Sequence, residues 1–268
     1  MASFPEWLAA ALHAREARVL GPRGGEHLVN LSPEAVHTVV LWSKDFSNLL
    51  RGASGLRGLL AAYDQIYLHF TVTGLGGTAI EPGVPPYRGA LAQLPALTAL
   101  AGDPRRVSVR FDPILFWREG GAVHSNIGHF AEVARASEAA GVRDIRVSFA
   151  QWYGKAIRRA SSRRFSFVVP SEEEQRSHAE KMAAIAASRG LVLHACCQPL
   201  LAGVPGISPS ACIDGELLAL LHPRSEPASL RKDRTQRASC LCTESRDIGS
   251  YTQGCPHGCV YCYANPKT

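Results

Sequence analysis

Short apolar runs alternate with longer amphipathic stretches over the first three-quarters of the chain. Five runs have the length and the β-branched or aromatic content of strands, namely 38–42, 66–70, 107–111, 145–149 and 191–195, and a weaker run covers 18–20. The intervening patterns predict helices near 5–15, 88–101, 125–140, 171–189 and 214–222. The fourth helix has the clearest boundaries, because Ser171 and Glu174 form a capping-box pattern and Gly190 follows its last turn.

Repeated strand–helix units predict an α/β protein with a parallel sheet and right-handed crossovers. About six units fit a (β/α) barrel, partial or closed, and a doubly wound sheet is the alternative. From about residue 203 the pattern breaks down, and Gly, Pro, Ser and Arg dominate 202–210 and 222–240. We therefore expect a barrel domain over 1–202. A loop-rich segment over 203–268 would pack on it, organised by metal.

Composition narrows the protein class further. The chain has 268 residues, of which 46% are hydrophobic and 19% charged, so it can bury a large core and is not of the disordered class. It contains no run of about 18 apolar residues, which predicts no membrane span, and no signal peptide is visible. We expect a cytoplasmic protein. The net charge of +6 favours an anionic partner or substrate.

All eight cysteines lie between Cys196 and Cys262, at the C-terminal end of the chain. Disulfide scaffolds are usually shorter and need covalent staples because their cores are small. A chain with an ample core and no export signal is better explained by reduced cysteines that bind a metal or a cluster.

The sharpest cysteine pattern is Cys-Pro-His-Gly-Cys-Val-Tyr-Cys, in which Cys255, Cys259 and Cys262 have the spacing C-x3-C-x2-C. Three thiolates in one short loop can each bind one iron of a [4Fe–4S] cluster and leave the fourth iron open. Zinc, with His257 or a remote cysteine as fourth ligand, and disulfides are the alternatives.

This loop resembles that of the radical S-adenosylmethionine (SAM) superfamily, and its residue sequence is especially similar to that of spore photoproduct lyase-like members. The resemblance implies that Cys255, Cys259 and Cys262 are the catalytic cluster's ligands and that Tyr261 neighbours the adenine of SAM. It also implies that the cluster reduces SAM to release a 5′-deoxyadenosyl radical. An electron donor such as flavodoxin or ferredoxin would then be a partner.

A second set of cysteines surrounds the pair Cys240 and Cys242. With Cys196 and Cys212 this pair supplies four thiolates, enough for a fully ligated auxiliary [4Fe–4S] cluster. Cys197 is then the spare, although spacing alone leaves the choice between Cys196 and Cys197 open. The alternative is that several of these cysteines are ordinary small buried residues.

Further motifs lie along nearly the whole chain, in the segments 41–44, 70–74, 81–82, 110–114, 147–149, 211–215 and 231–251, the last of which leads into the terminal cysteine loop. These motifs resemble the family catalogued as domain of unknown function 1848. In ordinary radical SAM enzymes the cysteine loop follows the first strand, whereas here six residues follow Cys262. We expect a circularly permuted arrangement, in which the helix near 5–15 takes the place of the helix after the loop.

Ligands of parallel sheets bind at the carboxyl ends of the strands, so polar residues there are site candidates. We expect Tyr153 and Asp112 in catalysis. The expected cofactor-binding residues are Tyr261, Arg110, Thr71, Thr73 and Glu81. The basic run of Lys155, Arg158, Arg159, Arg163 and Arg164 predicts a solvated face, with phosphate or nucleic-acid binding as the alternative.

Together these features predict a radical SAM enzyme with two [4Fe–4S] clusters acting on a small, anionic, nucleotide-like or phosphorylated substrate. The auxiliary cluster would relay electrons, anchor substrate or donate sulfide, and the last role would make the protein a sulfur-inserting biosynthetic enzyme. A DNA-repair lyase is the second enzymatic candidate, although nucleic acid is not the favoured partner. A non-catalytic zinc or iron–sulfur binding module is the candidate from another class.

Overall fold

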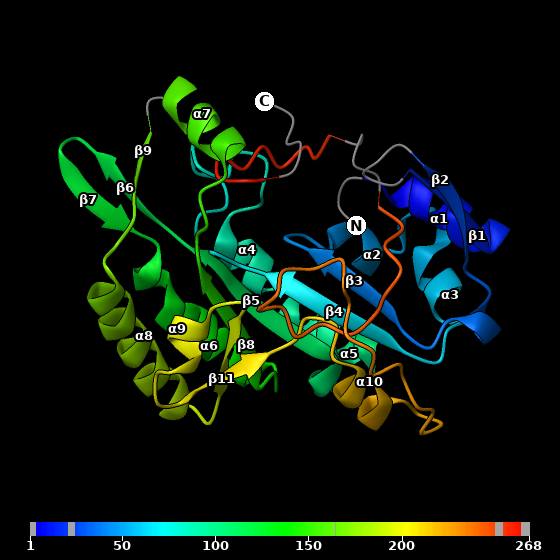
Figure 1. Cartoon of the computed structure of the whole chain (residues 1–268). Helices are drawn as coiled ribbons and strands as arrows, with labels where there is room; N and C mark the ends of the chain where they lie inside the picture. The colour runs from blue at the N-terminus through cyan, green and yellow to red at the C-terminus, as the bar shows by residue number, and fades with distance from the viewer. Residues whose placement is uncertain (1–3, 21–24, 164, 250–253, 264–268) are drawn as a thin grey trace.

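A six-stranded parallel sheet forms the centre of the computed structural model, which describes residues 4–20, 25–163, 165–249 and 254–263 (Figure 1). In spatial order its strands are β11 (Ile207–Ser210), β10 (Val192–Cys196), β8 (Asp144–Phe149), β5 (Val107–Ile114), β4 (Ile66–Thr71) and β3 (Val39–Ser43). Each strand lies beside its predecessor in this sheet, so the order never reverses. The five strands predicted most clearly from the apolar runs are confirmed, as is the α/β class with a parallel sheet.

The helices connect and flank these strands. They are α1 (Pro5–Ala14), α2 (Ser47–Leu50), α3 (Leu56–Leu60), α4 (Tyr87–Leu91), α5 (Leu94–Ala101), α6 (Phe130–Ala139), α7 (Gly154–Ser162), α8 (Glu172–Ala187), α9 (Pro199–Ala202) and α10 (Gly215–Leu221). The capping box of α8 is present in both directions, between Ser171 and Glu174. The helix expected over 88–101 is two helices. Pro95 lies in the first turn of α5, where its missing N–H costs no hydrogen bond.

Apolar and polar side chains alternate along the strands, so the two faces of the sheet differ. Leu68 and Phe70 of β4, Val109 of β5 and Val147 of β8 face one side and join the main apolar core, with helices α5, α6, α8 and α9. The neighbouring positions face the other side. They are mostly polar or aromatic: Tyr67, His69, Ser108, Arg110, Asp112, Arg146, Ser148, His194 and Cys196.

The C-terminal segment covers the polar face. A second apolar cluster there combines Tyr67 of β4 with Ala211, Ile213, Leu218 and Leu221, and it includes two of the cysteines, Cys240 and Cys242. The orange part of the chain crosses the strands in Figure 1. Cysteines and apolar side chains of this segment therefore lie directly over buried polar groups of the sheet.

Three expectations about strands need correction. The weak run at 18–20 is no part of the parallel sheet, since β1 (Glu16–Leu20) pairs with β2 (Glu26–Asn30) in an antiparallel ribbon. The sixth strand is instead β11, inside the segment expected to be loop-rich. Strands β6 (Phe116–Glu119), β7 (Ala122–Ser125) and β9 (Ser166–Val168) form a small antiparallel sheet that the apolar pattern did not indicate.

A closed barrel is not observed, because β3 and β11 end the strand order and do not pair with each other in the described residues. Residues 1–3 and 264–268 lie outside the described residues. The permuted arrangement of the terminal loop and the helix α1 stays a prediction. Among the described residues no helix is both long and apolar enough to cross a membrane.

Replacing Ser171 by Ala removes the side chain that caps α8 and should lower the free energy of unfolding by about 1 kcal/mol. The reason is that the backbone N–H of Glu174, which donates to Ser171 Oγ at 3.2 Å, loses this acceptor. Urea unfolding followed by circular dichroism measures the change. Ser177→Ala, at an exposed position of the same helix, is the control. An equal loss in both variants would contradict the capping account.

Candidate functional site

A cavity of about 610 Å³ opens at the carboxyl ends of the parallel strands. Strand ends contribute Thr71, Arg110, Asp112, Ser148 and Cys196 to its wall. Cys197 follows Cys196 in the wall, and the C-terminal chain contributes four more cysteines: Cys212, Cys240, Cys242 and Cys262. Both cysteine groups recognised in the sequence thus reach one cavity.

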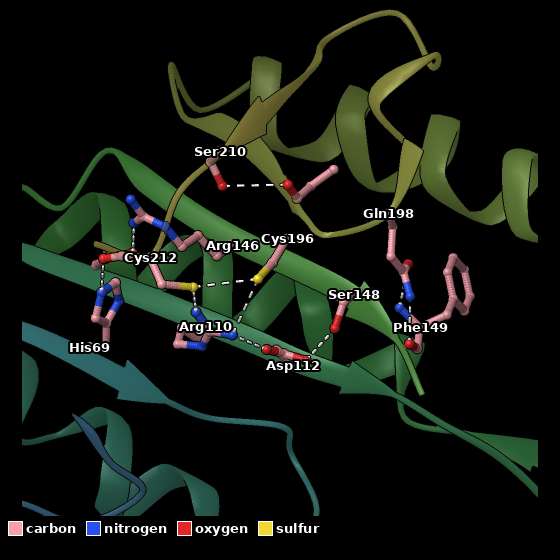
Figure 2. Close-up of polar contacts among 12 residues, drawn as sticks. His69, Arg110, Asp112, Arg146, Ser148, Phe149, Cys196, Gln198, Ser210 and Cys212 are labelled. Carbon is pink, nitrogen blue, oxygen red and sulfur yellow. Dashed lines mark hydrogen bonds and ion pairs between the residues drawn. The ribbon is translucent and has the colours of Figure 1, made fainter. Parts of the chain in front are cut away.

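Arg110 links the sheet to Cys212 and Cys196 (Figure 2). Its Nη1 donates to the Sγ of Cys212 at 2.8 Å, and its Nη2 lies 3.9 Å from the Sγ of Cys196. The same Nη2 pairs with the carboxylate of Asp112, which also accepts a hydrogen bond from Ser148 Oγ. The guanidinium is almost fully buried, and the carboxylate and the sulfurs raise the pKa of Arg110 against the opposing effect of burial. A fixed positive charge therefore lies between an acid and the sulfurs.

Five cysteines outside the terminal loop form one group, which we call the cysteine array: Cys196, Cys197, Cys212, Cys240 and Cys242. All five are free thiols. The Sγ atoms of Cys196 and Cys212 are 3.4 Å apart, and the backbone N–H groups of Cys212 and Ile213 donate to the Sγ of Cys242 at 3.2 and 3.4 Å. Burial and the neighbouring Cys240 raise the pKa of Cys197.

The pKa values of the array thiols are shifted in different directions. Hydrogen bonds from Cys196 and Cys242, together with Arg110, lower the pKa of Cys212. The same hydrogen bonds raise the pKa values of Cys196 and Cys242. These donors therefore favour the ionised form of Cys212.

A layer of buried basic side chains lies beneath the array. His69 has its Nε2 2.8 Å from the carbonyl oxygen of Cys212, and burial followed by the charges of Arg146 and Arg110 lowers its pKa to about 3, so it is neutral. Arg146, 2% exposed, donates to the carbonyl oxygen of Ala211 at 3.1 Å and to the hydroxyl of Ser108. Two positive charges thus stand behind the sulfurs, which favours an anionic group at the array.

The terminal cysteine loop, residues 254–263, docks on the connection that follows β4. The N–H of Val260 donates to the carbonyl of Ile80, and the N–H of Gly83 donates to the carbonyl of His257, both at 2.9 Å. A Cβ at Gly83 would come within 2.3 Å of the carbonyl oxygen of Pro256, so only glycine permits this approach. The loop is positioned by backbone contacts as well as by its side chains.

Glu81 is the buried centre of this docking. It is 1% exposed, and its Oε1 accepts hydrogen bonds from Thr73 Oγ1 at 2.6 Å, from Lys44 Nζ at 3.0 Å and from the hydroxyl of Tyr261. Burial and the neighbouring Glu81 carboxylate raise the pKa of Tyr261. One carboxylate therefore joins β3, β4 and the terminal loop, and it holds Tyr261 as a neutral donor.

Helix α7 holds the loop from the other side. Nη1 of Arg159 donates to the carbonyl oxygens of Val260 at 3.2 Å and Cys262 at 2.6 Å, and Nη1 of Arg163 donates to that of Gly258 at 3.4 Å. The basic run expected to be a solvated face is thus partly an anchor for the cysteine loop. Arg164 lies outside the described residues.

The donor set fits a soft metal or an iron–sulfur cluster by its chemistry, since every candidate ligand is a thiol. Burial raises the pKa of the Cys259 thiol to about 12, with Lys44 opposing and Cys262 and Cys255 adding to the rise. Metal binding deprotonates such thiols. Within the described residues, however, no group of three or more His, Cys, Asp or Glu side chains has the arrangement of a formed metal site.

The predicted site residues fall into two sets. Those that line the cavity are Tyr153, Asp112, Arg110, Thr71, Tyr261, Cys262 and four array cysteines, Cys196, Cys212, Cys240 and Cys242. The remainder, Thr73, Glu81, Cys255 and Cys259, lie outside its lining. Thr73 and Glu81 bond to this chain's own side chains, and their contact with a cofactor stays a prediction.

The predicted set of site residues left out several contributors. Lys44 lies just after a predicted strand and is a strand-end candidate without a predicted role. Ser148 lies near a strand end and could have been found from the same signal, whereas Arg159 has no signal beyond its place in a basic run. Cys197, expected to be the spare, lines the cavity together with Cys196.

Fold and site together define an α/β protein with two cysteine groups on one cavity. The chain belongs to the family described as domain of unknown function (DUF1848), whose family model matches residues 1–264. No curated protein and no solved structure matches the chain.

Replacing Arg159 by Ala should loosen the terminal loop, because two backbone carbonyls lose their shared donor. We expect amide hydrogen exchange over 254–263 to accelerate about tenfold, the equivalent of about 1.4 kcal/mol for the lost hydrogen bonds. Mass spectrometry of peptides from this region measures the rate. Arg158→Ala, which removes an exposed neighbouring cation, is the control. Unchanged exchange in the Arg159 variant would contradict the anchor.

Proposed function

We propose that this protein is a radical SAM enzyme with a catalytic cluster at Cys255, Cys259 and Cys262 and an auxiliary cluster at the cysteine array. The observation that carries the proposal is the shared cavity, whose wall includes Cys262 and Tyr261 of the loop together with the array thiols. When bound, the catalytic [4Fe–4S] cluster supplies the electron that cleaves SAM and so generates the radical that abstracts hydrogen from substrate.

The strand order and the one-sided main helices support a partial (β/α) barrel for this chemistry. The strands never reverse order, and α5, α6, α8 and α9 pack on the apolar face alone. A doubly wound sheet has a reversal point and helices on both faces. In the partial-barrel arrangement the polar face corresponds to the barrel interior, and the cavity lies at its active end.

The chain's own residues position the reacting groups. Glu81 fixes the Tyr261 ring at the cavity wall, where it would lie beside the adenine of SAM. Asp112 is held in place by Arg110 and Ser148, and Tyr153 is 45% exposed. Both line the cavity, where a substrate would contact them. The array faces the cavity directly, which favours substrate anchoring or sulfide donation over a remote electron relay.

The cavity also supports an anionic substrate. Lys44, Arg110 and Arg237 line it, and of these only Lys44 and Arg110 form ion pairs with a carboxylate in the described residues. Arg237 donates to Gln151 instead. Its charge is available to a carboxylate or phosphate of a small molecule.

A zinc-stabilised binding module is the second candidate, supported by the 3.4 Å distance between the Sγ atoms of Cys196 and Cys212. Two thiolates on one tetrahedral zinc ion lie about 3.8 Å apart, because Zn–S bonds are about 2.3 Å long. Such a module would fold around its metal and would not cleave SAM.

Anaerobic reconstitution with iron and sulfide, followed by dithionite and SAM, should release 5′-deoxyadenosine from the wild-type protein. The Cys255→Ala variant should fall to the background without protein, because the catalytic cluster loses a ligand. The Cys240→Ala variant should retain cleavage, because only the array is altered. Chromatography of the nucleoside products measures release. Stoichiometric zinc with no cleavage would support the binding module instead.

A further inference from the structure

Three aromatic rings form a row between the buried face of the sheet and the wall of the cavity. Trp42 of β3 and His69 of β4 are direct neighbours across the two strands, and their rings stack with centroids 4.8 Å apart and an interplanar angle of 19°. Tyr67 packs edge-on against His69 at a centroid distance of 5.1 Å. His69 and Tyr67 are buried, whereas Trp42 is 41% exposed and lines the cavity. The row therefore presents one aromatic side chain, Trp42, to a ligand in the cavity.

Polar contacts hold the two inner rings in place. Nε2 of His69 donates to the carbonyl oxygen of Cys212 at 2.8 Å, because a carbonyl oxygen can only accept. The hydroxyl of Tyr67 lies 3.4 Å from Nη1 of Arg146, a buried guanidinium. A binding surface that is already ordered loses little conformational freedom when a ligand packs on it. The indole of Trp42 is thus backed by rings that are held before any ligand arrives.

The charge around this row disfavours a cationic ligand. Arg110 and Arg146 lie close enough to His69 to lower its pKa, and Lys44 lines the cavity together with Trp42. Carboxylates pair with Arg110 and Lys44, but the described hydrogen-bond partners of Arg146 are neutral hydroxyl and carbonyl oxygens. A cation over the indole would therefore meet positive charge that is not compensated. A neutral or anionic ligand with an aromatic ring meets no such cost.

The row also borders the cysteine array. One ring, that of His69, separates Trp42 from the backbone of Cys212, and the residues Trp42 and Cys212 line the same cavity. Tyr261, by contrast, belongs to the terminal loop and is held by Glu81. The cavity thus offers one aromatic side chain on the terminal loop and another beside the array, which suits two different rings.

We propose that Trp42 is the stacking surface for a planar aromatic ring of the substrate and places that ring beside the cysteine array. The inference rests on the proposed function, because the ring belongs to the substrate of that enzyme and not to SAM. Stacking on an indole adds to the binding that burial alone provides, so it distinguishes an aromatic ring from a saturated one. The substrate class becomes an anion that carries an aromatic or heteroaromatic ring.

Two ring acids of equal charge and similar size separate stacking from burial. They are 2-naphthoate and its saturated counterpart, decahydronaphthalene-2-carboxylate, and isothermal titration calorimetry of the whole chain measures both dissociation constants. The wild-type protein should bind the aromatic acid about tenfold more tightly than the saturated acid. Trp42→Leu should lose this preference, because leucine keeps an apolar surface without a π system. Trp42→Phe should retain part of it.

Two controls separate the stacking surface from other causes. Trp7→Leu changes a tryptophan that packs on the main core outside the cavity lining, and its preference should stay within about twofold of wild type. Circular dichroism checks that each variant is folded. The second control titrates anaerobically reconstituted protein with S-adenosylhomocysteine, whose affinity should differ by less than about twofold between wild type and Trp42→Leu.

No binding of 2-naphthoate, equal affinity of the wild-type protein for the two acids, or an aromatic preference that survives in Trp42→Leu would overturn the stacking surface. A matching loss of affinity for S-adenosylhomocysteine in Trp42→Leu would overturn it in favour of the adenine of SAM. A wild-type protein that prefers the aromatic acid but never releases 5′-deoxyadenosine would refute the proposed function and leave the ring-binding surface standing.

Discussion

The ion pair between Arg110 and Asp112 is the interaction on which the site depends. A buried guanidinium needs acceptors for its donors, and here these are a carboxylate from the same strand and the sulfurs of Cys212 and Cys196. Removing either partner would leave a charge unpaired in a buried setting, at a cost of several kcal/mol. Asp112 holds the Arg110 guanidinium in place, and Arg110 in turn ties Cys212 of the C-terminal segment to the sheet.

The alternation of side chains across the sheet explains why polar groups gather there. Apolar residues at every second strand position pack against the helices. The intervening positions place Arg110, Arg146 and His69 on the opposite face. Polar side chains that are buried on this face need hydrogen-bond partners, because water is excluded from them. Cysteine sulfurs and backbone carbonyls of the C-terminal segment supply them, so this segment is an integral part of the fold.

The sequence predicted those features that depend on local pattern. The five strands and the capping box of α8 follow from periodicity and capping chemistry, and the strand-end rule placed Asp112 and Arg110 at the cavity. Features that depend on long-range pairing were missed, because nothing local marks them. Strand β11 contains Pro209, and its sequence is typical of a loop. It nevertheless forms an edge of the sheet, where the missing N–H of a proline is tolerated. Likewise, no local signal shows that Arg159 binds carbonyls about a hundred residues away.

The central claim is that two separate cysteine groups hold two iron–sulfur clusters at one cavity. Its most direct test is the iron and acid-labile sulfide content per chain after anaerobic reconstitution. The account predicts about eight irons in the wild-type protein, about four in either Cys255→Ala or Cys240→Ala, and almost none when both substitutions are combined. Stoichiometric zinc without labile sulfide, or an iron content that neither substitution lowers, would contradict it.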